Sequence, residues 1–386
     1  MKKMLFPIEK FRTLPTPFYF YDVELFRRTA QAALSEAQKY GYIIHYALKA
    51  NAGEKLLRLL SGMGFGADCV SGAEVQRAIG CGFAPQSIAF AGVGKRDDEI
   101  CLGLDSRIFS FNCESEQELE VVNELAKAKG VVAQVALRIN PNVDAHTHAH
   151  ITTGLDENKF GINLWQLNDV AKKVQQMGNL KLICIHFHIG SQITELEPFE
   201  ELCAKINELQ EQLERIGVAV AHVNVGGGLG VDYEHPDQNC IPPFAAYFAT
   251  INRRLKLRKG QQLHCELGRS IVAQCGTLIT KCLYVKELQK KNFVVLDAGM
   301  TDLIRPVLYA AYHKIENITP QHANEKVYDV VGPICESSDV FGKDVALPQA
   351  QRGDLFAIRT AGAYGEVMAS RYNLRQLPKA YFSDND

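Results

Sequence analysis

The sequence predicts an α/β fold in which a parallel (β/α)8 barrel is joined to a smaller β domain, and two observations carry that prediction. Up to Gly276, eight apolar runs rich in β-forming residues alternate with helical segments, a pattern typical of a barrel closed by parallel strand pairing. After Gly276, the β-rich runs follow one another through turns and loops, without long helices between most of them. A second domain, an antiparallel β-barrel or sandwich, fits that change of pattern.

The expected strands and helices of the first domain follow one another along the chain. The aromatic run 16–22 predicts a strand, and an amphipathic helix follows it from about Val23. The eight barrel strands are expected at 42–48, 66–70, 87–90, 107–111, 133–139, 182–188, 222–225 and 262–265. Helix starts are indicated by capping boxes at 71–74, 115–118 and 194–197, where a serine or threonine precedes a glutamate by three residues. A leucine and isoleucine stripe from 202 to 216 predicts an outer helix that rests on the strands.

The second domain shows strands of its own. These are expected at 277–288, 293–297, 327–331 and 355–360, and the aromatic run near the N-terminus is expected to pair with them. The predicted domain bounds are 23–275 for the barrel, and 1–22 together with 276–386 for the β domain.

Composition excludes several classes of protein. The chain has 386 residues, 47% hydrophobic and 22% charged, with a net charge of -2, which is ordinary for a globular protein and implies no attraction to nucleic acid or to a membrane surface. No apolar run approaches the roughly 18 residues of a transmembrane helix, and the N-terminus lacks a signal-peptide pattern, so we expect a cytoplasmic protein. The eleven scattered cysteines include no C-x-x-C pair, which indicates reduced thiols rather than a disulfide frame or a zinc site.

Chemically versatile residues gather where the predicted barrel strands end. Active sites of such barrels lie at the carboxyl ends of the strands. In chain order these ends carry Lys49, Asp68, Asn112, Arg138, His188, the glycines 226–228 and Glu266. That combination points to a phosphorylated aromatic cofactor and predicts no metal.

Lys49 ends the first barrel strand, which is apolar. An ammonium there is costly to bury unless it is paired, neutral or covalently committed, which makes Lys49 a candidate Schiff-base lysine. The alternative is a rim lysine that extends into solvent.

Two glycine turns follow neighbouring strands, at 225–230 and at 266–270. Glycines allow backbone N–H groups to approach a phosphate, and barrels often bind phosphate after their last two strands. Glu266 begins the second turn. A carboxylate beside the pyridine nitrogen of pyridoxal phosphate keeps that nitrogen protonated, which strengthens the ring as an electron sink. A salt bridge from Glu266 to Arg269 or to another cation is the alternative.

His186 and His188 lie on one face of a predicted strand, and His146, His148 and His150 precede them in the loop 140–161. No carboxylate is spaced with them in a metal-binding pattern. We therefore expect His188 to stack on a cofactor ring and Ser191 to donate to its phosphate. The long loop either covers a substrate or is an ordered excursion.

The second domain offers two further candidates. Cys335 lies in the stretch 332–339, beside acidic residues, and by default is a buried thiol; Tyr364 lies in a glycine turn and could be only a packed aromatic.

Seven motifs in order carry a resemblance. They read Tyr-Ala-Leu-Lys-Ala-Asn (46–51), Ala-Asp-Cys-Val-Ser-Gly-Ala-Glu (67–74), Glu-Asn-Lys-Phe-Gly-Ile (157–162), His-Phe-His-Ile-Gly-Ser (186–191), Gly-Gly-Gly-Leu-Gly (226–230), Cys-Glu-Ser-Ser-Asp (335–339) and Gly-Ala-Tyr-Gly with Met-Ala-Ser and Tyr-Asn after it (362–373). Together they resemble the fold-type III pyridoxal-phosphate decarboxylases, most closely the branch that acts on diaminopimelate. The match runs from about Thr16 to Pro378 and implies an alanine racemase-like fold.

The resemblance also implies roles for single residues. Lys49 would hold pyridoxal 5'-phosphate, His188 would stack on its ring and Glu266 would pair with the ring nitrogen. The residues implied in cofactor binding are Lys49, Asp68, His188, Ser191, Gly228, Glu266, Leu267, Gly268, Arg269 and Tyr364. Those implied in binding the distal amino acid group of the substrate are Arg269, Arg305, Tyr309, Glu336 and Tyr364.

In this family, a cysteine matching Cys335 donates a proton to Cα and comes from the partner subunit, so the resemblance implies a homodimer. Two departures from the family pattern are Leu267, where relatives usually carry proline, and Ser338, which replaces a glycine. The implied reaction is decarboxylation of meso-2,6-diaminopimelate to L-lysine. The alternatives are decarboxylation of ornithine, arginine or another basic amino acid on the same fold, and a catalytically silent regulator.

Overall fold

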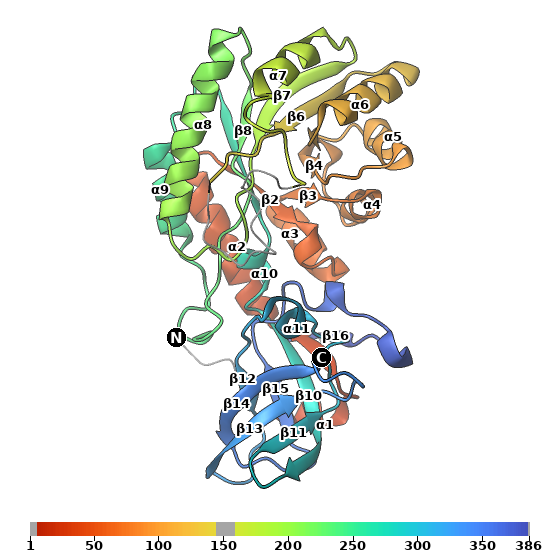
Figure 1. Cartoon of the computed structure of the whole chain (residues 1–386), viewed down its shortest axis with the longest axis vertical. Helices are drawn as coiled ribbons and strands as arrows, with labels where there is room; N and C mark the ends of the chain where they lie inside the picture. The colour runs from red at the N-terminus through yellow and green to blue at the C-terminus, as the bar shows by residue number, and fades with distance from the viewer. Residues whose placement is uncertain (1–5, 144–158, 385–386) are drawn as a thin grey trace. The chain divides into compact units, whose positions relative to one another are not determined.

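The computed structural model describes residues 6–143 and 159–384, which form two compact units. The barrel unit contains residues 30–230 and 243–268, and the β unit contains the described residues up to Thr29 together with 231–242 and those from Arg269 onward. In Figure 1 the barrel strands carry helices around their outside.

The barrel closes through eight parallel strands in the order β2-β3-β4-β5-β6-β7-β8-β9. Their bounds are β2 Ile43–Ala47, β3 Gly66–Cys69, β4 Ile88–Phe90, β5 Ser110–Cys113, β6 Ala133–Arg138, β7 Leu180–His186, β8 His222–Asn224 and β9 Gln262–Leu267. The eight-stranded barrel predicted from the sequence is therefore confirmed. The strand expected at 107–111 begins later, at Ser110, because Arg107 takes a left-handed conformation (φ 53°) that ends the preceding helix.

Helices alternate with these strands, and the first of them, α2, begins in the β unit and continues into the barrel unit. Their bounds are α2 Val23–Gln38, α3 Glu54–Met63, α4 Gly72–Gly80, α5 Asp97–Ser106, α6 Glu116–Ala128, α7 Leu167–Gln176, α8 Glu197–Arg215 and α9 Phe244–Arg254, with short 3-10 turns η1 Leu48–Ala50 and η2 Pro85–Ser87. The Ser71 and Ser115 side chains accept from the N–H groups of Glu74 and Glu118, which is one half of each predicted capping box. The two glutamate side chains accept from the N–H groups of Val70 and Glu114, one residue before each serine. The capping box expected at 194–197 is wrong, since Leu196 precedes α8 and makes no side-chain cap.

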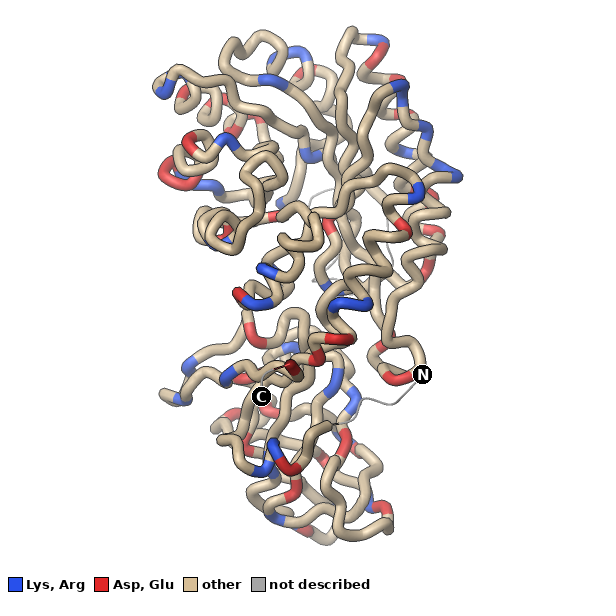
Figure 2. The backbone as a smooth tube through the Cα atoms, turned by 180° about the vertical axis from the view of Figure 1, so that it is seen from behind, with Lys and Arg blue, Asp and Glu red and all other residues tan. Residues whose placement is uncertain are grey.

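Apolar residues position the outer helices, whereas the barrel interior is unusually polar. Four residues of the predicted stripe, Leu202, Ile206, Leu209 and Leu213, are buried on α8. Inside the barrel, three imidazoles form a chain in which His264 bonds to His45 and to His222, each at 2.9 Å. Figure 2 marks the positions of basic and acidic residues along the backbone, and the two kinds are interspersed along the helices, as the small net charge implies.

The β unit is built on a mixed eight-stranded sheet, ordered β12-β15-β10-β11-β13-β14, with β1 pairing β10 and β16. The strands are β1 Phe18–Tyr21, β10 Gly276–Glu287, β11 Asn292–Leu296, β12 Ile315–Asn317, β13 Glu325–Val331, β14 Val340–Pro348, β15 Leu355–Ile358 and β16 Lys379–Phe382. The helices and 3-10 turns are α1 Ile8–Thr13, α10 Arg269–Val272, α11 Arg305–Tyr309, η3 Glu366–Met368 and η4 Tyr372–Leu374. Most pairs are antiparallel, but β1 with β16 and β11 with β13 are parallel.

The aromatic strand β1 pairs with β10, as expected from the sequence. Its side chains enter a core that contains Phe11, Phe18, Phe20, Ile279 and Leu355. Three strands, β12, β14 and β16, were not expected. No helix among the described residues combines the length and the apolar character that a bilayer crossing needs.

Candidate active site

Lys49 lies in the turn η1, directly after the carboxyl end of β2. Its Nζ atom is 3.7 Å from Oδ2 of Asp68 on β3, and the lysine side chain is partly exposed. Asp68 itself is 1% exposed, and neither of its carboxylate oxygens has a hydrogen-bond partner among the described residues. Burial, together with Glu266, raises the pKa of Asp68 although Lys49 opposes this shift. A buried acid without a donor, beside a lysine, leaves room for a ligand that supplies the donor.

Glu266 lies in β9 and is held by three side chains from other strands. Its Oε2 atom accepts from Nε2 of His186 at 2.9 Å, and its Oε1 atom accepts from Asn224 at 2.7 Å and from Asn112 at 3.3 Å. Burial raises the pKa of Glu266, but His186 and Lys49 outweigh it and hold that pKa well below its ordinary value. The carboxylate is therefore ionised at neutral pH, which is the state that would keep a pyridine nitrogen protonated.

His188 follows β7, and its ring is oriented by the glycine turn after β8. The N–H of Gly227 donates to Nδ1 of His188 at 3.3 Å. Burial and the cations of Lys49 and Arg138 lower the pKa of His188 well below its ordinary value. A neutral ring is therefore favoured, and it can stack on an electron-poor aromatic ring without charge repulsion.

The glycines of this turn are required by close backbone contacts. A Cβ atom on Gly226 would lie 2.2 Å from the carbonyl oxygen of Phe187, and one on Gly227 would lie 2.0 Å from that of Glu266. Gly228 has a φ of +107°, and we find no acceptor for its N–H among the described residues. The turn thus presents a backbone donor in a place where no side chain intervenes, as a phosphate site needs. Ser191 lies in the loop after β7, partly exposed.

The end of β9 is packed closely against the lysine turn. A Cβ atom on Gly268 would lie 3.0 Å from that of Ala50 and 3.1 Å from that of Ala47. Leu267 is the last residue of β9 and is fully buried, so an apolar side chain fits the position. Taken with the orphaned Asp68 and the ionised Glu266, these contacts fit pyridoxal phosphate at the strand ends.

Arg138, expected at the rim, is paired. Its Nη1 atom donates to Glu114 at 2.7 Å, and the other oxygen of Glu114 accepts from the N–H of Gly161 at 3.0 Å. The guanidinium also lies 4.7 Å from the ring centroid of Phe160. This pair therefore attaches the end of the 140–161 loop to the barrel. His146, His148, His150 and the stretch 157–158 lie outside the described residues.

The β unit contains a second group of expected residues, centred on two arginines that are each 5% exposed. Nη1 of Arg269 donates to the hydroxyl of Tyr233 at 2.6 Å, and its guanidinium lies 5.0 Å from the ring centroid of Tyr364. The guanidinium of Arg305 lies 5.1 Å from the ring centroid of Tyr233. Tyr309, four residues after Arg305, ends the same helix, α11.

Cys335 is exposed, so the buried thiol expected by default is wrong. The buried anchor of the loop around it is instead the carboxylate of Asp339. Asp339 is 3% exposed and accepts from the N–H groups of Met300 at 2.6 Å and Ile334 at 2.7 Å. Beside the cysteine, Glu336 accepts from the hydroxyl of Tyr372 at 2.7 Å.

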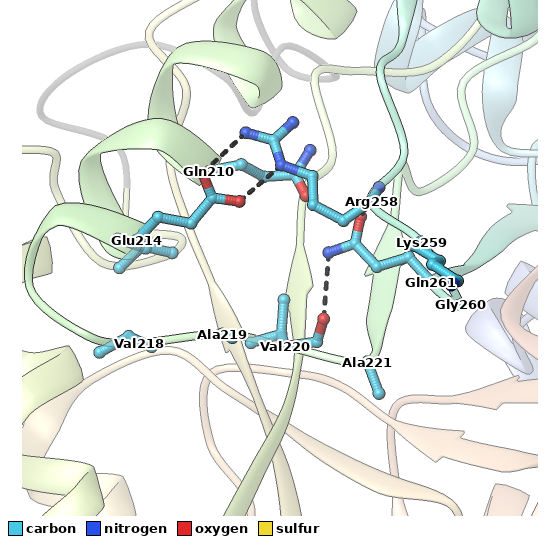
Figure 3. A pocket seen from close by; sticks show the side chains of 11 residues that line it. Gln210, Glu214, Val218, Ala219, Val220, Ala221, Arg258, Lys259, Gly260 and Gln261 are labelled. Carbon is cyan, nitrogen blue, oxygen red and sulfur yellow. Dashed lines mark hydrogen bonds and ion pairs between the residues drawn. The ribbon is translucent and has the colours of Figure 1, made fainter.

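A pocket in the barrel unit lies away from these residues. Figure 3 shows it between the Glu214–Arg258 ion pair and the segment from Val218 to Ala221. Its lining precedes β8 and β9, at the amino ends of the strands. Because Lys49 and Glu266 lie toward the carboxyl ends, the pocket belongs to the opposite end of the barrel.

Several partners of the site residues were missed from the sequence: His186 and Asn224 for Glu266, Tyr233 and His313 for the arginines, and Tyr372 for Glu336. Asn224 stands at the end of β8, and that position was a signal that could have found it. The others give no signal until the fold brings them into contact.

Comparison with known proteins agrees with this geometry. The sequence model of the family "Pyridoxal-dependent decarboxylase, pyridoxal binding domain" matches residues 24–273. A diaminopimelate decarboxylase of Bacteroides thetaiotaomicron is 58% identical over 383 residues, which cover 99% of this chain and 99% of the relative.

Two solved structures extend that likeness to the fold. Diaminopimelate decarboxylase from Helicobacter pylori, complexed with L-lysine, has a TM-score of 0.91 at 41% identity, covering 97% of this chain and 93% of that one. The enzyme of M. jannaschii in complex with L-lysine has a TM-score of 0.90 at 36% identity, covering 98% and 90%. The chain therefore belongs to the family of pyridoxal-dependent decarboxylases, in the group of the diaminopimelate decarboxylases.

Proposed function

We propose that this protein decarboxylates meso-2,6-diaminopimelate to L-lysine, with pyridoxal 5'-phosphate held by the barrel. The observation that carries the choice of substrate is Arg305, a buried cation for which no ion pair with a carboxylate is found among the described residues. Ornithine and arginine have no carboxylate at their distal end, whereas diaminopimelate has one. The names and identities of the relatives support the same substrate.

On the cofactor side, Lys49 would hold pyridoxal phosphate through its amine, and Asp68 lies beside that amine. His188 would stack on the ring, Glu266 would pair with the ring nitrogen, and the residues that would bind phosphate are Ser191, Gly228, the turn Glu266–Arg269 and Tyr364. When bound, pyridoxal phosphate accepts the electron pair left on Cα as carbon dioxide departs. The partners of Glu266 support its role, because they hold the carboxylate ionised and fixed.

On the substrate side, Arg269, Arg305, Tyr309, Glu336 and Tyr364 bind the distal amino acid group. An arginine fork can meet a carboxylate with two parallel hydrogen bonds, and Glu336 suits the ammonium of the same group. Fixing this end orients the scissile bond, so binding energy at the distal end contributes to the rate as well as to affinity.

Cys335 donates the proton to Cα, and we propose that it does so across a homodimer. Its exposure on the single chain supports that role. Near Glu336, the same surface carries exposed apolar residues, among them Tyr372 at 48% and Leu374 at 96% exposure. Such a surface fits contact with a second copy of the chain. All eleven cysteines are free, which supports a reducing compartment, the cytoplasm.

The proposal is tested by measuring carbon dioxide release from meso-diaminopimelate, ornithine and arginine side by side. We expect release from diaminopimelate at a rate at least about a hundredfold above that from the other two. Faster release from ornithine or arginine would refute the substrate. Borohydride reduction followed by peptide mass mapping is expected to place a pyridoxyl adduct on Lys49, and an adduct elsewhere would refute the cofactor assignment.

A further inference from the structure

Two of the deeply buried arginines in the β unit have opposite electrostatic surroundings. Arg359 is 2% exposed and is neutralised by Asp237 at 2.8 Å and Glu316 at 2.7 Å. Arg305 is 5% exposed, no carboxylate pairs with it among the described residues, and its Nε atom has no hydrogen-bond partner there. Burying an unpaired charge is costly. The same unit avoids this cost at Arg359, where two carboxylates compensate the charge. The lack of such compensation at Arg305 indicates that its charge interacts with a ligand.

His313 is a hydrogen-bonding partner of Arg305, and the hydrogen bonds of its ring define its protonation state. Its Nδ1 atom lies 2.9 Å from the carbonyl oxygen of Arg359, so this nitrogen must donate. Its Nε2 atom lies 2.9 Å from Nη1 of Arg305, so this nitrogen must accept. The ring is thus neutral and presents a lone pair to the guanidinium. Burial, with Arg305 and Arg269 nearby, lowers the pKa of His313 to about 3, so the ring stays neutral through the physiological range.

Tyr233 supports the same guanidinium from another side. Its ring lies under Arg305, and its hydroxyl accepts from Arg269 at 2.6 Å. The rings of Tyr233 and His313 meet edge to face at 5.2 Å. One phenol therefore contacts both arginines and the histidine.

We propose that His313 and Tyr233 are positioning residues that hold Arg305 in place without neutralising it, so that its charge selects a substrate carrying a carboxylate far from the reacting carbon. This inference rests on the proposed function, because it assigns a mechanism of selection to the distal end of that substrate. A carboxylate in the place of His313 would hold the arginine equally well but would satisfy its charge. The neutral side chain is therefore what the selection requires.

The test compares two ligands that differ only in the carboxylate, L-lysine and 1,5-diaminopentane, by titration calorimetry on the holoenzyme. His313→Glu is expected to weaken L-lysine binding by about tenfold or more, while binding of the diamine changes by less than about twofold. His313→Gln keeps a neutral acceptor and is expected to stay within about threefold of the wild type for both ligands. His222→Gln, in the barrel unit, is the control for loss of a histidine and should leave both affinities unchanged.

Three results would count against the inference. Unchanged preference for L-lysine in His313→Glu would refute it, and so would equal weakening of both ligands, which is the signature of a structural role. A wild-type enzyme that binds the diamine as tightly as L-lysine would refute the proposed function, and the inference with it. If His313→Glu does not fold, Tyr233→Phe replaces it, with selective loss of L-lysine affinity expected and loss of neither or of both refuting the idea.

Discussion

The chemistry of Glu266 depends on the side chains around its carboxylate. His186, Asn224 and Asn112 all donate to it, and His186 together with Lys49 holds its pKa well below the ordinary value although burial raises it. Glu266 therefore acts as a fixed negative charge, and its role depends on that charge more than on the shape of the side chain.

Replacing Glu266 with glutamine tests this point. The side chain keeps its size but loses its charge, so we expect kcat to fall by about a hundredfold or more while the cofactor remains attached to Lys49. Turnover and absorbance of the bound cofactor would be measured on the same preparation. Glu201→Gln, on the exposed face of α8, is the matched control and should be unaffected. Full activity of Glu266→Gln would contradict the role.

The stability of the fold is expected to depend on pH through His313. The folded pKa of His313 is about 3, below its ordinary value of 6.5. Between these values the unfolded chain binds a proton that the folded chain does not, so this histidine destabilises the fold as the pH falls below 6.5. Relative to His313→Gln, the wild type should lose about 1 kcal/mol between pH 6.5 and pH 5.5. Urea denaturation of both proteins at pH 6.5 and 5.5 measures the change, and a pH-independent difference would show that the ring has the same pKa in the folded chain as in the unfolded chain, which contradicts the prediction.

Among the elements, the glycine turn after β8 packs so closely against neighbouring backbone that a Cβ atom on Gly226 or Gly227 would clash with it. Gly227 approaches the backbone of Glu266, whose carboxylate faces the proposed cofactor site. The turn therefore couples the packing of two strand ends to the binding of phosphate.

Gly227→Ala should break that coupling. Its Cβ atom would lie 2.0 Å from a carbonyl oxygen, so the turn must move, and we expect a loss of about 2 kcal/mol or more in stability together with weaker cofactor binding. Denaturation midpoints and a cofactor titration check both effects. Gly62→Ala in α3 meets no atom within 4 Å and should instead gain about 0.5–1 kcal/mol. Equal behaviour of the two variants would disprove the packing argument.

At the scale of the whole molecule, the proposed dimer makes one clear prediction. If Cys335 acts in the partner's site, mixing subunits of Lys49→Ala with subunits of Cys335→Ala restores activity. A heterodimer then has one complete site, and random mixing should recover up to about a quarter of wild-type activity. The assay follows carbon dioxide release after the mixed subunits are dissociated and reassociated. No recovery would place Cys335 in the site of its own chain.

The domain bounds 23–275 and 1–22 with 276–386, expected from the sequence, stay a prediction. In the structure the compact β unit also includes residues 23–29, residues 231–242, which carry Tyr233, and those from Arg269 to Cys275. Residues 231–242, which lie between the barrel elements β8 and α9 in sequence, are thus grouped by contact with the β unit. Periodicity could not reveal this, because grouping is a property of long-range contacts.

The sequence by itself determined the alternation of strands and helices, because apolar periodicity is local, and it determined the family, because the motifs are contiguous. It also placed Lys49, Asp68, His188 and Glu266 at strand ends. Only the tertiary structure decided which groups control their charge. The donors to Glu266 come from 154, 80 and 42 residues away, and the neutral environment of Arg305 depends on His313 and Tyr233. Burial and hydrogen bonding between distant residues set protonation, and neither quantity is encoded in any single stretch of the chain.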